Sequence, residues 1–220
     1  MKLIVITTEC FFEGETDAIN MLFDNGLELL HLRKPNESEA DTAGFIEQIH
    51  PQYHNSIVLH DHFSLTKRFH LKGIHLNRRN PVASENFHGT KSLSCHSFME
   101  LLENSDKMDY LFFSPVFDSI SKKNYMSGLW DPIVYEIKEF TEEVAAQLTE
   151  WAFYDLKDKG IIHEKVIALG GVNKENMHKV KDYGFGGAAV LGGLWGDFPQ
   201  QQDTEKLLTR FKEIQHAANQ

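Results

Sequence analysis

Short apolar runs alternate with amphipathic segments along most of the chain. Each run is too short for a helix, and most residues in these runs are apolar, which is typical of strands buried on both faces of a parallel sheet. The runs predict eight strands at residues 3–6, 27–32, 57–59, 73–76, 92–95, 110–113, 166–169 and 188–191.

The segments between these runs carry apolar residues at helical spacing. They predict helices at residues 15–25, 38–50, 63–71, from 96 onward, after 173 and at 204–217. In the fourth of these, Phe98, Leu101 and Leu102 are expected on the inner face, and Asn173 is expected to cap the fifth. Eight alternating units predict an α/β fold with a parallel sheet closed as an eight-stranded βα (TIM) barrel; a doubly wound open sheet is the alternative.

Two glycine pairs follow the last two predicted strands, Gly170 with Gly171 and Gly192 with Gly193. Glycine leaves the backbone N–H groups unobstructed, and the last two loops of many βα barrels bind phosphate. The pairs therefore favour a phosphate site; the alternative is that they only mark tight turns.

A chain of 220 residues suits one domain, 1–220, near the short end for this barrel. The helical segment at about 130–160 is longer than one barrel unit needs. Its acidic outer face is expected to be solvated surface, with Trp130 and Trp151 as candidates for a subunit interface in a homo-oligomer.

Composition narrows the class of protein. A formal net charge of -10 argues against a nucleic-acid partner. Cys10 and Cys95 are the two cysteines, too few for a disulfide framework. No apolar run reaches membrane-spanning length, and the one at the start is too short for a signal peptide. We therefore expect no membrane partner and a cytoplasmic protein.

Polar residues gather where the predicted strands end, and in a βα barrel these ends form one rim. Arginine and lysine bind phosphate groups, hydroxyls donate to their oxygens, and Asp61 offers a ligand for a hard divalent ion. For each residue taken alone, a solvated loop position is the alternative. His75 is expected to be a packed strand residue. The candidate rim residues are His31, Arg33, Lys34, His60, Asp61, Asn80, Ser94, His96, Ser119, Ser121 and Lys122.

Five segments, in order and with matching spacing, resemble the thiamine phosphate synthase superfamily, whose other branch is the thiazole tautomerases. The segments are residues 73–76, 94–97, 109–117, 167–172 and 187–191, and the resemblance extends over nearly the whole chain. It implies a reaction that joins hydroxymethylpyrimidine diphosphate to thiazole phosphate with Mg²⁺ and releases diphosphate. The implied ligands are therefore small phosphorylated molecules.

The resemblance also implies roles for individual residues. Arg33 matches the synthase arginine, His31 replaces a glutamine, and Lys34 lies one residue before the family's lysine position, which is Pro35 here. The metal-binding positions carry Asp61 and a neutral Asn80. The further matches are Ser94 for diphosphate, Ser119, Ser121 and Lys122 for two hydroxyls and a cation, and Gly171 for thiazole phosphate; Gly192 stands where the family commonly has serine.

Three functional hypotheses follow. The first is a synthase-like transferase in which Arg33 and Lys122 stabilise the departing diphosphate. The second is a thiazole phosphate tautomerase, favoured by His31; the tautomerase histidine of the sixth strand is Pro115 here, so His60 or His96 would transfer the proton. The third is a non-catalytic binder of a thiamine precursor.

Overall fold

Eight parallel strands form a closed barrel in the computed structural model, which describes residues 1–117 and 142–220 and, within 142–149, the backbone alone. Each strand pairs with the next, and β1 pairs with β8 through Leu3 and Ala188. The predicted barrel is confirmed, and the pairing of first with last strand rules out the open sheet. The strands are β1 Lys2–Ile6, β2 Leu29–Leu32, β3 Ile57–Leu59, β4 Gly73–Leu76, β5 Thr90–Cys95, β6 Tyr110–Phe113, β7 Val166–Ala168 and β8 Gly187–Val190.

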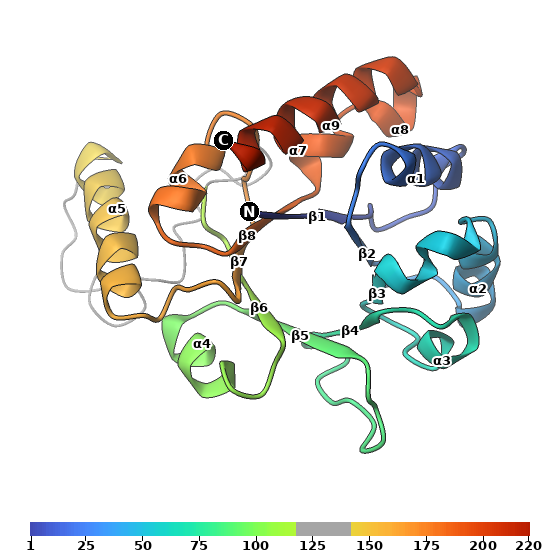
Figure 1. Ribbon diagram of the computed structural model, residues 1–220, viewed down its shortest axis with the longest axis horizontal. Coiled ribbons are helices and arrows are strands. Elements are labelled where there is room, and N and C mark those ends of the chain that lie inside the picture. Colours follow the sequence, from blue (N-terminus) through green and yellow to red (C-terminus); the bar gives the residue numbers. More distant parts are fainter. Residues whose placement is uncertain (118–141) are drawn as a thin grey trace.

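Helices surround the barrel on its outside (Figure 1). The C-terminal helix α9 lies against the start of the chain, where the Met1 amino group donates to Ala218 O at 3.1 Å. The described helices are α1 Glu15–Asp24, α2 Glu39–Glu47, η1 Pro51–Ser56, α3 Leu65–Phe69, α4 Phe98–Asn104, α5 Glu142–Asp158, α6 Met177–Asp182, α7 Gly192–Trp195, α8 Phe198–Gln201 and α9 Thr204–Asn219.

Side chains alternate along each strand between the barrel interior and the helix layer. In β2, Leu29 joins the interior cluster with Ile4, Val58 and Phe112, whereas Leu30 joins the cluster between strands and helices. His31 follows on the interior side and is fully buried. The barrel interior is therefore polar in part, and this decides the chemistry below its rim.

The helices depart from the sequence expectations in two places. Leu102 on α4 is 51% exposed while Leu101 is buried, so one of the predicted inner-face residues lies outside. The predicted Asn173 cap was also wrong: α6 begins at Met177 after Asn176, and the Asn173 side chain accepts from the N–H groups of Glu175 and Asn176 in the turn before it.

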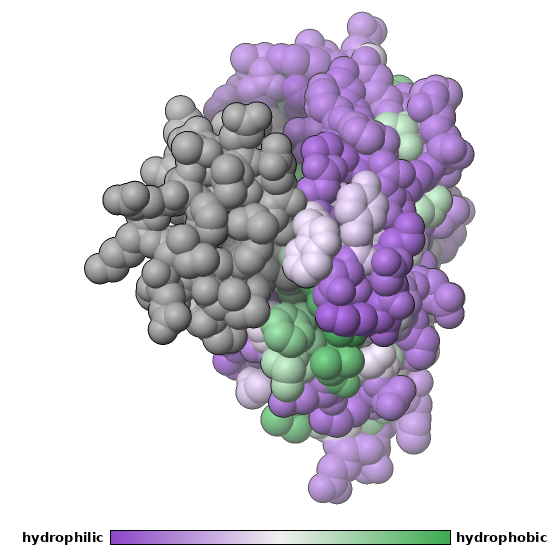
Figure 2. Space-filling view, turned by 90° about the vertical axis from the view of Figure 1, so that its left-hand side faces the viewer, coloured by the Kyte–Doolittle hydropathy of each residue, from purple (hydrophilic) through white to green (hydrophobic). Residues whose placement is uncertain are grey.

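The long helical segment is represented by α5, which covers residues 142–158. Trp151 on this helix is 66% exposed, whereas Trp130 lies outside the described residues. Hydrophilic residues dominate the coloured part of the face in Figure 2, with a smaller group of apolar residues exposed among them. Within residues 1–117 and 142–220, no helix is both long enough and apolar enough to cross a membrane.

The two cysteines differ in their surroundings, which allows a simple check of the fold. Cys10 is exposed, whereas Cys95 at the end of β5 is fully buried, and burial raises the pKa of its thiol to about 12. Because the thiolate is the reactive form, we expect iodoacetamide to label Cys10 alone in the native protein and both residues after denaturation. Peptide mass spectrometry measures this; rapid native labelling of Cys95 would contradict the packing of β5.

Candidate active site

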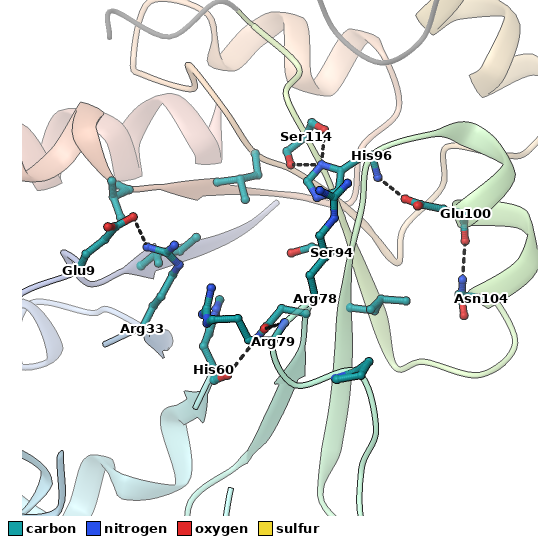
Figure 3. Close-up of a pocket in the computed structure, with 16 residues that line it drawn as sticks. Glu9, Arg33, His60, Arg78, Arg79, Ser94, His96, Glu100, Asn104 and Ser114 are labelled. Atoms are coloured by element: carbon teal, nitrogen blue, oxygen red, sulfur yellow. Dashed lines mark hydrogen bonds and ion pairs between the residues drawn. The ribbon is translucent and has the colours of Figure 1, made fainter. Parts of the chain in front are cut away.

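A cavity of about 570 Å³ opens at the carboxyl ends of the strands (Figure 3). Each of the eight strands contributes a lining residue at its last position or near it, because parallel strands all end on the same rim. These eight residues are Ile6, Arg33, His60, Asn77, Ser94, Ser114, Leu169 and Leu191. The pocket therefore joins parts of the chain that are far apart in sequence, and it is the candidate active site.

Three arginines line this pocket, which favours an anionic ligand. Arg33, which follows β2, pairs with Glu9 at 2.6 Å. Arg78 and Arg79 come from the loop after β4, and for Arg78 no ion pair or hydrogen bond is found within the described parts of the chain. The sequence interpretation took Asn80 from this loop and missed both arginines. The signal was present, since a pair of arginines directly after a strand belongs to the same rim.

The residues expected to bind Mg²⁺ are arranged differently. Arg79 Nη2 lies 3.2 Å from Asp61 Oδ1, so the Asp61 carboxylate already forms an ion pair with a guanidinium. Asn80 Nδ2 donates to the His60 carbonyl oxygen and to Asp61 Oδ1, both at 3.0 Å. Asn80 thus presents its amide nitrogen, whereas Mg²⁺ needs oxygen ligands. As arranged here, Asp61 and Asn80 do not fit a magnesium ion.

Replacing Arg79 tests whether this arginine also binds the anion. We expect Arg79→Met to weaken pyrophosphate binding about tenfold in the presence of a chelator, because one of the pocket's cations is lost. Calorimetry with pyrophosphate measures this change. Arg68→Met is the matched control, because Arg68 is exposed on α3 and pairs with Glu47. Unchanged affinity in Arg79→Met would show that Arg79 only anchors Asp61.

Lys34 was expected to bind phosphate at the rim, and the structure corrects this expectation. Its side chain is 1% exposed, and Nζ lies 2.7 and 2.8 Å from the two carboxylate oxygens of Glu15, itself fully buried. Nζ also donates to Cys10 O and lies over the ring of Phe11. Burial lowers the pKa of Lys34 and raises that of Glu15, so each needs the other to remain charged. The pair ties the loop after β2 to the start of α1 and leaves no ammonium for a ligand.

Two of the three histidines expected at the rim, His31 and His60, lie at different depths. His60, directly after β3, is 4% exposed and lines the pocket. His31 lies below the pocket inside the barrel, where Nδ1 is 2.9 Å from His60 Nε2 and Nε2 is 2.7 Å from the Tyr110 hydroxyl. Burial lowers the pKa of both imidazoles well below the usual range, so both are neutral near pH 7. Of these two, the structure brings His60 to the pocket surface.

The serines of the site are only partly covered by the structure. Ser94 on β5 lines the pocket, and its hydroxyl is 2.7 Å from His75 Nε2. His96 lines the same wall, and its Nδ1 is 3.0 Å from Ser114 O. Ser119, Ser121 and Lys122 lie outside the described residues.

The four glycines of the rim differ in backbone conformation and in the space around them. Gly170 and Gly171 have φ values of 93° and 65°, a conformation that favours glycine. A Cβ on Gly170 would lie 2.9 Å from Pro115 Cα, and one on Gly193 would lie 2.6 Å from Val172 O. Close packing thus accounts for Gly170 and Gly193. A Cβ on Gly192 would meet nothing within 4 Å, so open space lies beside this residue.

Comparison with known proteins places this architecture in a family. Residues 2–194 match the family described as thiamine monophosphate synthase. The crystal structure of thiamine phosphate pyrophosphorylase from Bacteroides thetaiotaomicron is 37% identical, with a TM-score of 0.81 over 100% of this chain and 98% of that one. The thiamine-phosphate synthase of Persephonella marina is 23% identical over 94% of both chains, and that of Dictyoglomus turgidum is 23% identical over 83% of this chain and 78% of its own. This chain, with its closed barrel and its pocket at the strand ends, belongs to the thiamine monophosphate synthase family.

Proposed function

We propose that this protein is a thiamine phosphate synthase-like transferase of thiamine biosynthesis, which couples hydroxymethylpyrimidine diphosphate to thiazole phosphate. The observation that carries the proposal is the cationic pocket at the carboxyl ends of the strands, lined by Arg33, Arg78, Arg79 and Ser94. Family membership over residues 2–194 supports the same reaction class.

The pocket residues suit a dissociative transfer. The bond between the pyrimidine methylene carbon and the diphosphate oxygen breaks, and diphosphate leaves with the electron pair. Arg33 and Arg78 stabilise this developing negative charge, and the Ser94 hydroxyl donates to an oxygen. The thiazole nitrogen then forms the new bond to the methylene carbon. Apolar lining residues such as Leu169 and Leu191 suit the heterocycles. We assign Ser119, Ser121 and Lys122 to the same diphosphate on the sequence resemblance alone.

The thiazole phosphate group is proposed to lie beside the glycine loops after β7 and β8. Leu169 and Leu191, which directly precede these glycine pairs, line the pocket. The open space at Gly192 supports this assignment, and Gly171 belongs to it by the sequence resemblance.

The role of Mg²⁺ is part of the test. The sequence resemblance implies this ion, but the arrangement of Asp61 and Asn80 does not fit it. The proposed reaction steps therefore use the residues of the chain alone. The decisive assay incubates purified protein with both substrates, once with Mg²⁺ and once with a chelator, and measures thiamine phosphate by chromatography. We expect product with Mg²⁺ and a large loss in Arg33→Ala, with Arg68→Ala as the control. Absence of product at high enzyme concentration with Mg²⁺ would reject the synthase proposal.

A second candidate, thiazole phosphate tautomerase, rests on one observation. His60 brings a neutral imidazole to the pocket, and its Nε2 shares a hydrogen bond of 2.9 Å with His31 Nδ1. A neutral imidazole can accept and return a proton, as a tautomerisation requires. For this function, activity should persist in chelator and fall at least a hundredfold in His60→Gln. Full tautomerase activity in that variant would exclude His60 as the proton carrier.

A further inference from the structure

Three histidines from neighbouring strands meet inside the barrel, at the base of the pocket. His31 lies on β2, His60 directly after β3, and His75 on β4. The centroid of the His31 ring lies 5.1 Å from that of His60 and 5.3 Å from that of His75. Each histidine has one ring nitrogen that lies within 4.8 Å of a ring nitrogen of each of the other two. Among the described side chains, those of residues 1–117 and 150–220, no other group of three histidines, cysteines or carboxylates comes as close.

Buried hydroxyl groups hold two of these rings in place. The Tyr110 hydroxyl lies 2.7 Å from His31 Nε2, and the Ser92 hydroxyl lies 2.9 Å from His75 Nδ1. A histidine that binds a metal ion through one ring nitrogen usually makes a hydrogen bond through the other. This hydrogen bond fixes the orientation of the ring and its tautomer. With these partners in place, His31 Nδ1 faces His60, and His75 Nε2 faces Ser94 at the pocket wall.

The three imidazoles are shielded from solvent: His31 and His75 are fully buried, and His60 is 4% exposed. An imidazole binds a metal ion through the lone pair of one ring nitrogen. Imidazole nitrogen suits Zn²⁺, Co²⁺ and similar first-row ions, whereas Mg²⁺ prefers oxygen ligands.

We propose that His31, His60 and His75 bind one divalent transition-metal ion of the zinc type inside the barrel. Three histidines with a fourth, open position form a known kind of tetrahedral zinc site. The fourth ligand comes from the pocket side, where Ser94 lies 2.7 Å from His75 Nε2 and also lines the cavity. This site is separate from the Asp61 and Asn80 positions, and it does not depend on the proposed synthase activity.

The distances also indicate how tightly the ion should bind. His31 Nδ1 and His60 Nε2 are 2.9 Å apart, whereas two nitrogen ligands of a tetrahedral zinc ion lie about 3.3 Å apart. The rings of His60 and His75 are stacked at 4.2 Å and must tilt apart for their lone pairs to converge. The site therefore requires a small rearrangement, and we expect a dissociation constant on the order of 1–10 μM.

The direct test is a Co²⁺ titration of tag-free, chelator-treated protein, followed by visible absorption. We expect one Co²⁺ per chain with the intense absorption typical of tetrahedral coordination, and its displacement by Zn²⁺. His31→Gln and His75→Gln should each weaken binding at least a hundredfold. His88→Gln and His178→Gln are the matched controls, because both residues are exposed, and they should bind Co²⁺ as the wild type does.

A second measurement avoids variants of the buried cluster, since these can unfold the barrel. X-ray absorption spectroscopy of the zinc-loaded wild-type protein counts the imidazole ligands, and we expect three. Absence of Co²⁺ binding at about 1 mM, or fewer than three imidazoles on the bound zinc, would overturn the proposal. So would wild-type affinity in a folded His75→Gln variant.

Discussion

Lys34→Met is expected to destabilise the protein by about 3–5 kcal/mol, because it leaves the Glu15 carboxylate buried without its partner. Lys34 Nζ lies 2.7 and 2.8 Å from the Glu15 oxygens, and the two side chains are 1% and 0% exposed. Methionine retains most of the lysine's apolar stem, so the lost charge is the main change. Denaturant unfolding, followed by circular dichroism, measures the free energy of unfolding.

The double variant Lys34→Met with Glu15→Leu separates the lost charge from lost packing. It should recover most of the stability, because a buried ion pair replaced as a whole by apolar residues is often neutral in free energy. Arg68→Met is the exposed control and should change stability by less than about 1 kcal/mol, since the Arg68–Glu47 pair is solvated. A loss below about 1 kcal/mol in Lys34→Met would contradict the buried pair.

Gly192→Val is expected to weaken thiazole phosphate binding at least tenfold, about 1.4 kcal/mol, in a protein that still folds. A Cβ at this position meets no atom within 4 Å, so the valine side chain begins in open space, where we propose that the phosphate lies. This residue is a better probe than Gly171, whose φ of 65° would add backbone strain to any substitution. Calorimetry with thiazole phosphate gives the affinity.

Gly44→Ala is the matched control for Gly192→Val. Gly44 lies in α2, and a Cβ there also meets nothing within 4 Å, so binding should stay at the wild-type level. Pyrophosphate affinity should change little in both variants, because the arginines of the β2 and β4 loops are proposed to bind it. Unchanged thiazole phosphate affinity in a folded Gly192→Val protein would show that the phosphate does not lie beside β8.

Most of the fold was predictable because strand and helix formation depend on near neighbours in the sequence. The runs at residues 57–59, 73–76 and 110–113 are strands with the same bounds in the structure, and the others differ by one or two residues at their ends. Eight strands alternating with helices also favour the closed barrel, and the pairing of β1 with β8 decides against the open sheet. Local spacing says less about which side of a short helix is buried, as Leu102 shows on α4.

The candidate site was predictable as a region but not as a set of contacts. Strand ends meet on one rim of a βα barrel, so the sequence predicted Arg33, His60 and Ser94 at that rim, and all three line the pocket. It could not show that Arg79 pairs with Asp61, because both follow strands and only the course of their loops brings the charges together.

The sequence alone determined the eight alternating strand and helix units and the polar character of the strand ends, because both follow from the pattern along the chain. The tertiary structure decided which charges remain available to a ligand. Lys34 meets Glu15 across 19 residues, and His31 meets Tyr110 across 79. Such contacts depend on strand register and on the packing of loops, which short-range sequence patterns do not encode. For that reason the buried ion pair and the three-histidine cluster emerged only from the folded structure.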